Sequence, residues 1–539
     1  MRRIIKHLDN LTAPALLAAG ALLCLAFAAV WFGGLNQDEG WYLYAAQMVR
    51  AGHLPYRDFF YTQGPAMPFV YSVLAPVWGR GSPLQGILGG RIVTLVLGLV
   101  GIGCAVALAR RLVPPARRSA ASLAVFALLA CNLYHLYFNT IPKTYALGGL
   151  FLMAGLLLIV RGLETLGAKG GACLFAGGLS LAFATGTRIS LLLILPVVGV
   201  TLLLRFRTFK WSFLWYGFGG ATGLLLTYGV FTLDADSLRG LLAAQSYHAA
   251  RGGFDPFFVI GSVSRLLRGY LALGVAAFAA ACLRVRTEAS GEEEPERSRE
   301  VAHTMFWILG VGFLAVFALQ LSAPFPYDDY QVPIMGMLTV LVAAWLVRTL
   351  PEGRAWCIGA AWFVVLTALA ISFASPLLQE WATYSNDRFW SQKKEKTELA
   401  KLRDVGRMIN ELDPDGDTLL TQDLYLAVET GRTVPRGLEM GPFSYFADLP
   451  DEDARALHVM NRSLMEQLLE SAPSPVAACS GYAFAITAPS CGETPFDEQT
   501  KMFEVLKRRY RRAGSVYNFG QNTTTLLLFK RRSAPPQGE

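Results

Sequence analysis

Long apolar runs separated by short polar segments fill most of the first 375 residues. Helices long enough to cross about 30 Å of hydrocarbon can be placed at 11–33, 84–109, 119–138, 144–161, 171–187, 189–204, 211–233, 268–283, 303–322, 332–348 and 355–375. The pattern predicts a polytopic α-helical membrane protein with about eleven transmembrane helices.

Shorter units alternate after residue 376, where the long apolar runs stop. Helical patterns occur at 393–412, 451–470 and 497–512, and strand-like patterns at 417–422, 476–487 and 523–531. This alternation is typical of a small α/β domain. The sequence therefore predicts a transmembrane module over 1–375 and an α/β domain over 376–539.

Composition and charge agree with a membrane protein. Hydrophobic residues make up 53% of the chain and charged residues only 16%, which excludes an ordinary soluble domain of this size. The net charge of +8 comes from short basic clusters in alternate loops, with no stripe suited to nucleic acid. By the positive-inside rule the N-terminus is expected to be cytoplasmic, and the loop 34–83 and the C-terminal domain extracytoplasmic.

The first predicted extracytoplasmic loop is rich in acidic and aromatic residues. It contains the sequence NQDEGWYLYAAQMVRAGHLPYRDFFYTQGP, in which Asp38 and Tyr42 stand four apart and share a face of an expected amphipathic helix. Two interpretations stay open from the residues alone. The acids and aromatic side chains belong either to a catalytic site, or to a helix cap and an interfacial aromatic belt.

This loop resembles the first extracytoplasmic loop of GT-C membrane glycosyltransferases, in particular family 39 and its bacterial relatives that transfer mannose to proteins or aminoarabinose to lipid A. The matching positions are Asp38, Glu39, Tyr42, Gly52, Tyr61 and Pro65. The resemblance implies a GT-C-like fold, a polyprenyl-phosphate-sugar donor and an inverting transfer. It implies that Asp38 is the general base, with Glu39 beside it as a second catalytic acid, in a bacterial inner membrane protein.

One departure from the aminoarabinose-type pattern concerns the end of the loop. Those enzymes carry an acidic residue and a lysine before the closing proline, where this chain has Gln63 and Gly64. Asp58, Tyr61 and Gln63 are therefore expected to line the site with Tyr42, without a metal-bridged phosphate. No cofactor is predicted to be required, and participation of a divalent cation such as Mg²⁺ or Mn²⁺ is left open.

Transfer from a lipid phosphate needs cations, because the leaving group departs as an anionic phosphate. Arg188 and Lys143 interrupt the positive-inside pattern on the extracytoplasmic side, and Arg251 follows in a polar segment. The sequence predicts that they bind the donor phosphate. The alternative for each is a structural role, in which the side chain extends to the lipid headgroups or neutralises an acid in the bundle.

His248, Tyr327 and Tyr330 are further candidates for the sugar pocket, although a YDDY segment by itself is more often a polar turn between two spans than a site. The six histidines show no zinc spacing, and no phosphate-binding glycine loop is present. Cys479 and Cys491 are the one pair in the polar C-terminal region, and their pairing is left open.

The predicted function is transfer of a sugar from a polyprenyl-phosphate carrier to a hydroxyl of an envelope glycan, lipid or protein. The main alternative is a transporter or flippase for a lipid-linked or small polar substrate, for which paired discontinuous helices and internal symmetry would be expected. A non-catalytic scaffold is a third alternative. Donor, acceptor and membrane lipids are the expected partners.

Overall fold

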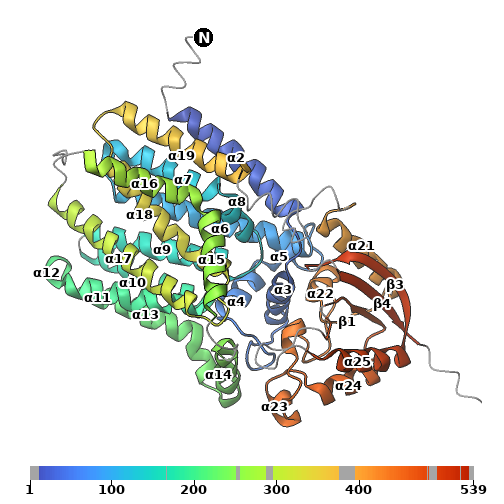
Figure 1. Cartoon of the computed structure of the whole chain (residues 1–539). Helices are drawn as coiled ribbons and strands as arrows, with labels where there is room; N and C mark the ends of the chain where they lie inside the picture. Colours follow the sequence, from blue (N-terminus) through green and yellow to red (C-terminus); the bar gives the residue numbers. More distant parts are fainter. Residues whose placement is uncertain are drawn as a thin grey trace, which may run out of the picture. The chain divides into compact units, whose positions relative to one another are not determined.

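The computed structural model describes residues 11–165, 167–249, 255–286, 295–374, 395–481, 483–484, 494–521 and 524–532 (Figure 1). The chain divides into two compact units. The first comprises Met1–Val30, Thr94–Gly229 and Phe254–Tyr384, and the second comprises Trp31–Val93, Val230–Gly253 and Ser385–Glu539. The first predicted extracytoplasmic loop and the C-terminal region thus fall in the same unit.

Long apolar helices confirm a multi-pass membrane protein. Within the described residues seven are long and apolar enough to span, namely α2 (Thr12–Phe32), α6 (Ile87–Arg111), α9 (Thr144–Glu164), α10 (Gly167–Thr187), α17 (Glu296–Leu321), Asp328–Arg348 and α19 (Arg354–Ala374). The segment Asp328–Arg348 consists of the 3₁₀ helix η4 (Asp328–Ile334) and α18 (Met335–Arg348). An eighth is formed if α15 (Pro256–Gly269) and α16 (Leu271–Arg286), bent by 74°, are one span.

The prediction of about eleven spans was therefore too high. The run at 119–138 divides into α7 (Arg118–Ala130) and α8 (Leu133–Phe138), because Asn132 ends the first helix and caps the second by accepting from the His135 N–H at 3.1 Å. The runs at 189–204 and 211–233 form helices that are shorter than a full span. They form η2 (Ile189–Leu193), α11 (Ile194–Leu204), α13 (Ser212–Tyr228) and η3 (Gly229–Thr232).

Two short helices, η1 (Pro115–Arg117) and α12 (Phe206–Phe209), complete the first unit. Close approach of small residues packs its helices. A Cβ atom at Gly178 of α10 would lie 2.2 Å from the Tyr216 carbonyl oxygen of α13, so only glycine lets these backbones meet. Such contacts replace the hydrophobic driving force that lipid does not supply.

The second unit is built from short helices and one small sheet. Its helices are α3 (Gln37–Arg50), α4 (Ala66–Val73), α5 (Ala75–Trp78), α14 (Ala235–Ala249), α21 (Glu398–Leu412), α22 (Leu424–Thr430), η5 (Gly441–Ser444), α23 (Asp451–Ala456), α24 (Arg462–Ser471) and α25 (Phe496–Arg509). The strands are β1 (Leu420–Thr421), β2 (Val476–Cys479), β3 (Tyr510–Phe519) and β4 (Thr524–Arg531), in the order β1-β2-β4-β3. β1 pairs parallel with β2, and the other pairs are antiparallel, so the sheet is mixed.

Most of the predicted C-terminal elements are present, but α22 and η5 were not predicted, and β1 and β2 are shorter than the predicted strands. The predicted helix at 451–470 is broken into α23 and α24, and residues 510–512, taken as the end of a helix, begin β3 instead. Apolar side chains of β4 fix this strand, because Leu526 and Leu528 are fully buried. β3 then pairs with β4 along its length.

Candidate active site

A capped helix carries the acidic pair of the first loop. α3 begins after Asn36, whose side chain accepts from the Asp38 N–H at 3.0 Å, while the Asn36 N–H donates to Glu39 Oε1 at 2.9 Å. This reciprocal arrangement is a capping box, which satisfies the first amides of a helix. The predicted helix is confirmed, and Glu39 takes part in its cap.

Glu39 is also half of a buried ion pair. Its carboxylate accepts from Arg91 Nε at 2.7 Å and from Arg91 Nη2 at 2.6 Å, and the two side chains are 0% and 1% exposed. Arg91 further donates to the carbonyl oxygens of Gly33 and Gly34 at 2.9 and 2.7 Å. A two-point pair of this kind fixes orientation as well as charge. Glu39 therefore ties the start of α3 to the start of α6.

Asp38 differs from its neighbour in exposure. It is only partly buried, and its Oδ1 accepts from Trp41 Nε1 at 3.0 Å. The Trp41 ring stacks on Tyr42, and Tyr61 meets both rings edge-on at centroid distances of 5.7 and 6.3 Å. Tyr42 and Tyr61 thus pack around the Trp41 ring, and the partly buried Asp38 is hydrogen-bonded to the same ring.

The rest of the loop is held by its own contacts. Asp58 accepts from the Leu54 N–H at 2.7 Å and pairs with Arg57 at 2.9 Å. The Arg57 guanidinium lowers the pKa of the Asp58 carboxyl. Gln63 is partly buried, and its carbonyl oxygen accepts from the Tyr56 hydroxyl. Asp58 is therefore ionised at neutral pH and stabilises the conformation of the loop.

The first unit holds a separate cluster of buried charges around η4. Lys143 pairs with Asp329 Oδ2 at 3.3 Å, and the Tyr145 hydroxyl donates to the same oxygen at 3.0 Å. Asp328 accepts from Arg265 Nε at 2.9 Å and from the Tyr134 hydroxyl at 2.6 Å. The two aspartates of the YDDY segment thus pair with Lys143 and Arg265 and accept hydrogen bonds from two tyrosines.

Arg188 lies against the aromatic rings of this cluster. Its guanidinium carbon is 4.4 Å from the centre of the Tyr330 ring and 5.3 Å from that of Tyr145, and the residue is 9% exposed. The Lys143 ammonium is 5.4 Å from the centre of the Tyr145 ring. Arg188, Lys143 and Tyr330, which the sequence nominated separately, are therefore brought together around Tyr145.

Tyr327 lies at the edge of the same cluster and is 45% exposed, with its ring against Phe258 and Tyr330. Lys143, Arg188 and Arg265 thus bring three cations to this cluster. Fixed cations in a poorly hydrated place form strong, charge-assisted hydrogen bonds with anions.

Two predicted residues cannot be placed in a site. His248 belongs to α14, but its side chain lies outside the described residues, and so does Arg251. Asp38, Glu39, Tyr42, Asp58, Tyr61 and Gln63 lie in the second unit, and Arg188, Lys143, Tyr327 and Tyr330 in the first.

In the described ranges, no group of three or more His, Cys, Asp or Glu side chains is arranged to hold a metal ion. Cys479 on β2 is a buried free thiol, and Cys491 lies outside the described residues.

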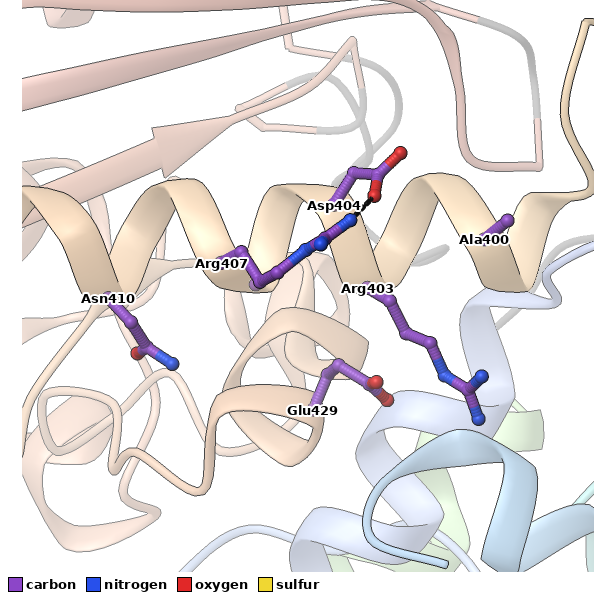
Figure 2. Close-up of a pocket in the computed structure, with 7 residues that line it drawn as sticks. Ala400, Arg403, Asp404, Arg407, Asn410 and Glu429 are labelled. Atoms are coloured by element: carbon purple, nitrogen blue, oxygen red, sulfur yellow. Dashed lines mark hydrogen bonds and ion pairs between the residues drawn. The ribbon is translucent and has the colours of Figure 1, made fainter.

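A surface hollow of about 560 Å³ lies on the second unit, lined by Ala400, Arg403, Asp404, Gly406, Arg407, Asn410 and Glu429. Figure 2 shows Arg403 of α21 and Glu429 of α22 on the same side of α21. Asp404 pairs with Arg407. Glu429 is occupied by a structural contact, because its Oε2 accepts from the Ile87 N–H at 3.2 Å. This lining contains no residue of the predicted site.

Sequence reasoning missed the partners of the predicted residues. Arg91, Tyr134 and Tyr145 carry the contacts described above, yet each stands within or beside an apolar run and matches no motif. The one local signal for Arg91 was its position inside the predicted span 84–109, because a charge within a span requires a partner.

Comparison with known proteins was informative only at the level of structure. No family model matches the chain, and no curated protein matches it in sequence. ArnT from Cupriavidus metallidurans bound to undecaprenyl phosphate superposes with a TM-score of 0.60 and 13% identity, covering 96% of this chain and 98% of that chain. The apo state of the same protein gives a TM-score of 0.58 and 12% identity over the same shares.

The chain has a GT-C-like fold. The archaeal oligosaccharyltransferase of Archaeoglobus fulgidus is more distant, with a TM-score of 0.49 and 10% identity over 86% of this chain and 69% of that chain. The superposition with ArnT confirms the fold expected from the loop residues.

Proposed function

We propose that this chain is a glycosyltransferase that takes a sugar from a polyprenyl-phosphate carrier and passes it to a hydroxyl group on the extracytoplasmic face of the membrane. The observation that carries the proposal is the superposition with ArnT bound to undecaprenyl phosphate, over 96% of this chain and 98% of that one. The acceptor hydroxyl would belong to an envelope glycan, a lipid or a protein, and the membrane would be the bacterial inner membrane.

Asp38 is the proposed general base. Its carboxylate is partly exposed, whereas that of Glu39 is enclosed by Arg91. As the acceptor oxygen attacks the anomeric carbon, Asp38 takes the hydroxyl proton and the bond from that carbon to the phosphate oxygen breaks. The sugar is transferred with inversion. General-base catalysis of this kind contributes about 10²–10⁴-fold to the rate.

Charge balance supports Arg188 and Lys143 as the phosphate site. A polyprenyl-phosphate sugar is a monoanionic diester, and transfer releases a phosphate monoester that carries a second negative charge. Fixed cations in a low-dielectric place stabilise this developing charge more than they stabilise the donor. Lys143 and Arg188, which both lie beside Tyr145, would supply two such cations.

The remaining residues shape the pocket in this proposal. Tyr42 and Tyr61 are 4% and 0% exposed and pack against Trp41, which donates to Asp38. Tyr327 and Tyr330 are more exposed and offer ring faces of the kind on which sugar rings pack. Glu39 has a structural role, because its two contacts with Arg91 leave it no exposed surface. Asp58 and Gln63 hold the course of the loop.

The test is a transfer assay with purified protein in vesicles, using radiolabelled polyprenyl-phosphate sugars and an envelope extract as acceptor. Asp38→Asn should abolish transfer at unchanged protein abundance. Asp234→Asn is the matched control, because this exposed carboxylate only caps α14 through Ser237, and it should transfer at the wild-type rate. Undiminished transfer by Asp38→Asn would remove Asp38 from the mechanism.

The same vesicles separate transfer from transport. A transporter would move the labelled lipid between leaflets and leave its sugar–phosphate bond intact.

Orientation is checked with single cysteines at two exposed positions, His53 in the first loop and Ser119 at the start of α7. An impermeant maleimide should label His53→Cys from outside intact cells and leave Ser119→Cys unlabelled; labelling of both would contradict the proposed topology.

A further inference from the structure

The C-terminal part of the second unit contacts α3 along its buried face. The Gln37 N–H donates to Gln521 Oε1 at 2.9 Å at the start of the helix, and the Tyr44 hydroxyl accepts from the Val434 N–H at 2.9 Å two turns later. Between these points α22 lies beside α3 (Figure 1). The helix that presents Asp38 is therefore held by residues 390 and 484 positions away in the sequence.

The closest approach is at Gly40. A Cβ atom there would lie 2.4 Å from the Tyr425 backbone nitrogen and 2.8 Å from the Leu424 carbonyl carbon. Since real Cβ atoms do not come so close to backbone, α3 and the start of α22 meet main chain to main chain. Any displacement of α22 is thus transmitted to α3 two residues from Asp38.

Asp423 fixes the start of α22 in this contact. Its side chain is fully buried, and Oδ1 accepts from the Tyr425 hydroxyl at 2.9 Å and from Ser480 Oγ at 2.8 Å. Oδ2 accepts from the Ser480 N–H at 3.1 Å. The carboxylate therefore joins the end of β2 to the first turn of α22.

Gln37 extends the network to α3. Its side chain hydrogen-bonds to Asp423, and its Nε2 lies 3.5 Å from the Gln422 carbonyl oxygen. These donors to Asp423 are neutral, and burial raises the pKa of its carboxyl. A buried carboxylate held only by neutral donors is costly, because its desolvation is not offset by an ion pair. A packed apolar side chain would be cheaper if Asp423 only filled space.

We propose that Asp423 is a positioning residue for transfer, which locks the α22–β2 junction against Gln37 and Gly40 and so holds Asp38 at the reacting hydroxyl. This inference rests on the proposed function, because it assigns Asp423 an effect on the base through α3. Catalysis depends on such placement, since an error of about 1 Å far from the chemistry can cost about 10²-fold in rate.

The test compares Asp423→Asn with Asp413→Asn in the full-length protein. Asp413 pairs with Arg432 at 2.9 Å in the same region and takes no part in the network that joins α22 to α3, so it reports a loss of structure alone. With rates corrected for the folded fraction, Asp423→Asn should lower kcat about 10²-fold with an unchanged KM for the donor. Asp413→Asn should keep the wild-type kcat.

A second readout does not depend on activity. Amide hydrogen exchange over residues 37–46 should become faster in Asp423→Asn and stay unchanged in Asp413→Asn. If Asp423→Asn does not fold, Ser480→Ala, which removes one donor to the carboxylate, should show the same pattern to a smaller extent. Wild-type kcat and wild-type exchange over 37–46 in a folded variant of the network would overturn the proposal.

Failure of this inference differs from failure of the proposed function. If Asp38→Asn retains transfer, the assignment of the base is wrong, whatever Asp423 does. If Asp38→Asn is inactive while Asp423→Asn, per folded molecule, equals wild type in kcat and pH profile, only the positioning role is wrong.

Discussion

The acidic pair at the start of α3 is expected to separate into one residue for catalysis and one for stability. Glu39→Gln keeps the shape of the side chain but removes the charge that faces Arg91 through contacts of 2.7 and 2.6 Å. Both partners are at most 1% exposed, so the arginine is left as an uncompensated buried charge. Breaking a buried pair in this way costs about 3–5 kcal/mol.

Loss of this pair is expected to change the folding equilibrium strongly and the transfer rate of the folded protein little. A loss of about 3–5 kcal/mol corresponds to about two to three and a half orders of magnitude in the folding equilibrium, since about 1.4 kcal/mol is tenfold. Asp38→Asn removes a partly exposed carboxylate that accepts from Trp41, and should cost about 1 kcal/mol. Its transfer rate should nevertheless fall by about 10²–10⁴-fold.

Unfolding of the purified protein can be followed with a thiol-reactive dye, because the buried thiols Cys131 and Cys479 react only after opening. Transfer is then measured per folded molecule. Glu39→Gln should unfold at a much lower temperature while its folded fraction retains activity, and Asp38→Asn should show the opposite pattern. The reasoning is refuted if Glu39→Gln is as stable as wild type, or if its folded fraction is inactive.

Three further outcomes follow from the same contacts. Arg188→Ala should weaken donor binding by about 1–3 kcal/mol, measured with radiolabelled donor, and unaltered affinity would dismiss the phosphate role. Burial raises the pKa of Glu439 to about 7, from an ordinary value of 4.5, so its ionisation should destabilise the fold by about 3 kcal/mol as pH rises from 4.5 to 7. Glu439→Gln should abolish that loss in unfolding curves at the two pH values; a variant as pH-sensitive as wild type counts against it. Gly40→Ala should disrupt the contact with Tyr425 and lower both unfolding temperature and kcat, whereas normal values for both would show that the helices can move apart freely.

Local patterns predicted the elements whose structure depends on neighbours in the sequence. The Asn36–Glu39 spacing is a helix start in itself, and α3 begins there. The number of spans was overestimated because runs such as 189–204 are apolar enough but too short, and because Asn132 interrupts a continuous apolar stretch. β3 was missed because its first residues continue a basic helical pattern, and pairing with β4 decides the outcome.

The site could be predicted only in part, for a related physical reason. Acidic and aromatic residues, and cations that break the positive-inside pattern, can be recognised in the sequence one residue at a time. These features selected Asp38, Arg188 and Lys143. Their partners are set by tertiary contacts, and Arg91 stands 52 positions from Glu39. Asp423 was not a candidate at all, since a lone acid after a short strand carries no signal until Ser480 and Gln37 are folded around it.

The central claim is that Asp38 drives transfer from a polyprenyl-phosphate sugar, and a single-turnover experiment tests it most directly. Donor labelled in both the sugar and the lipid phosphate is mixed with excess enzyme and acceptor, and the two labels are followed separately. Wild-type protein should release one polyprenyl phosphate for each sugar attached to acceptor, and Asp38→Asn should release neither. Equal release by the variant, or donor that changes leaflet with its sugar–phosphate bond intact, would contradict the account.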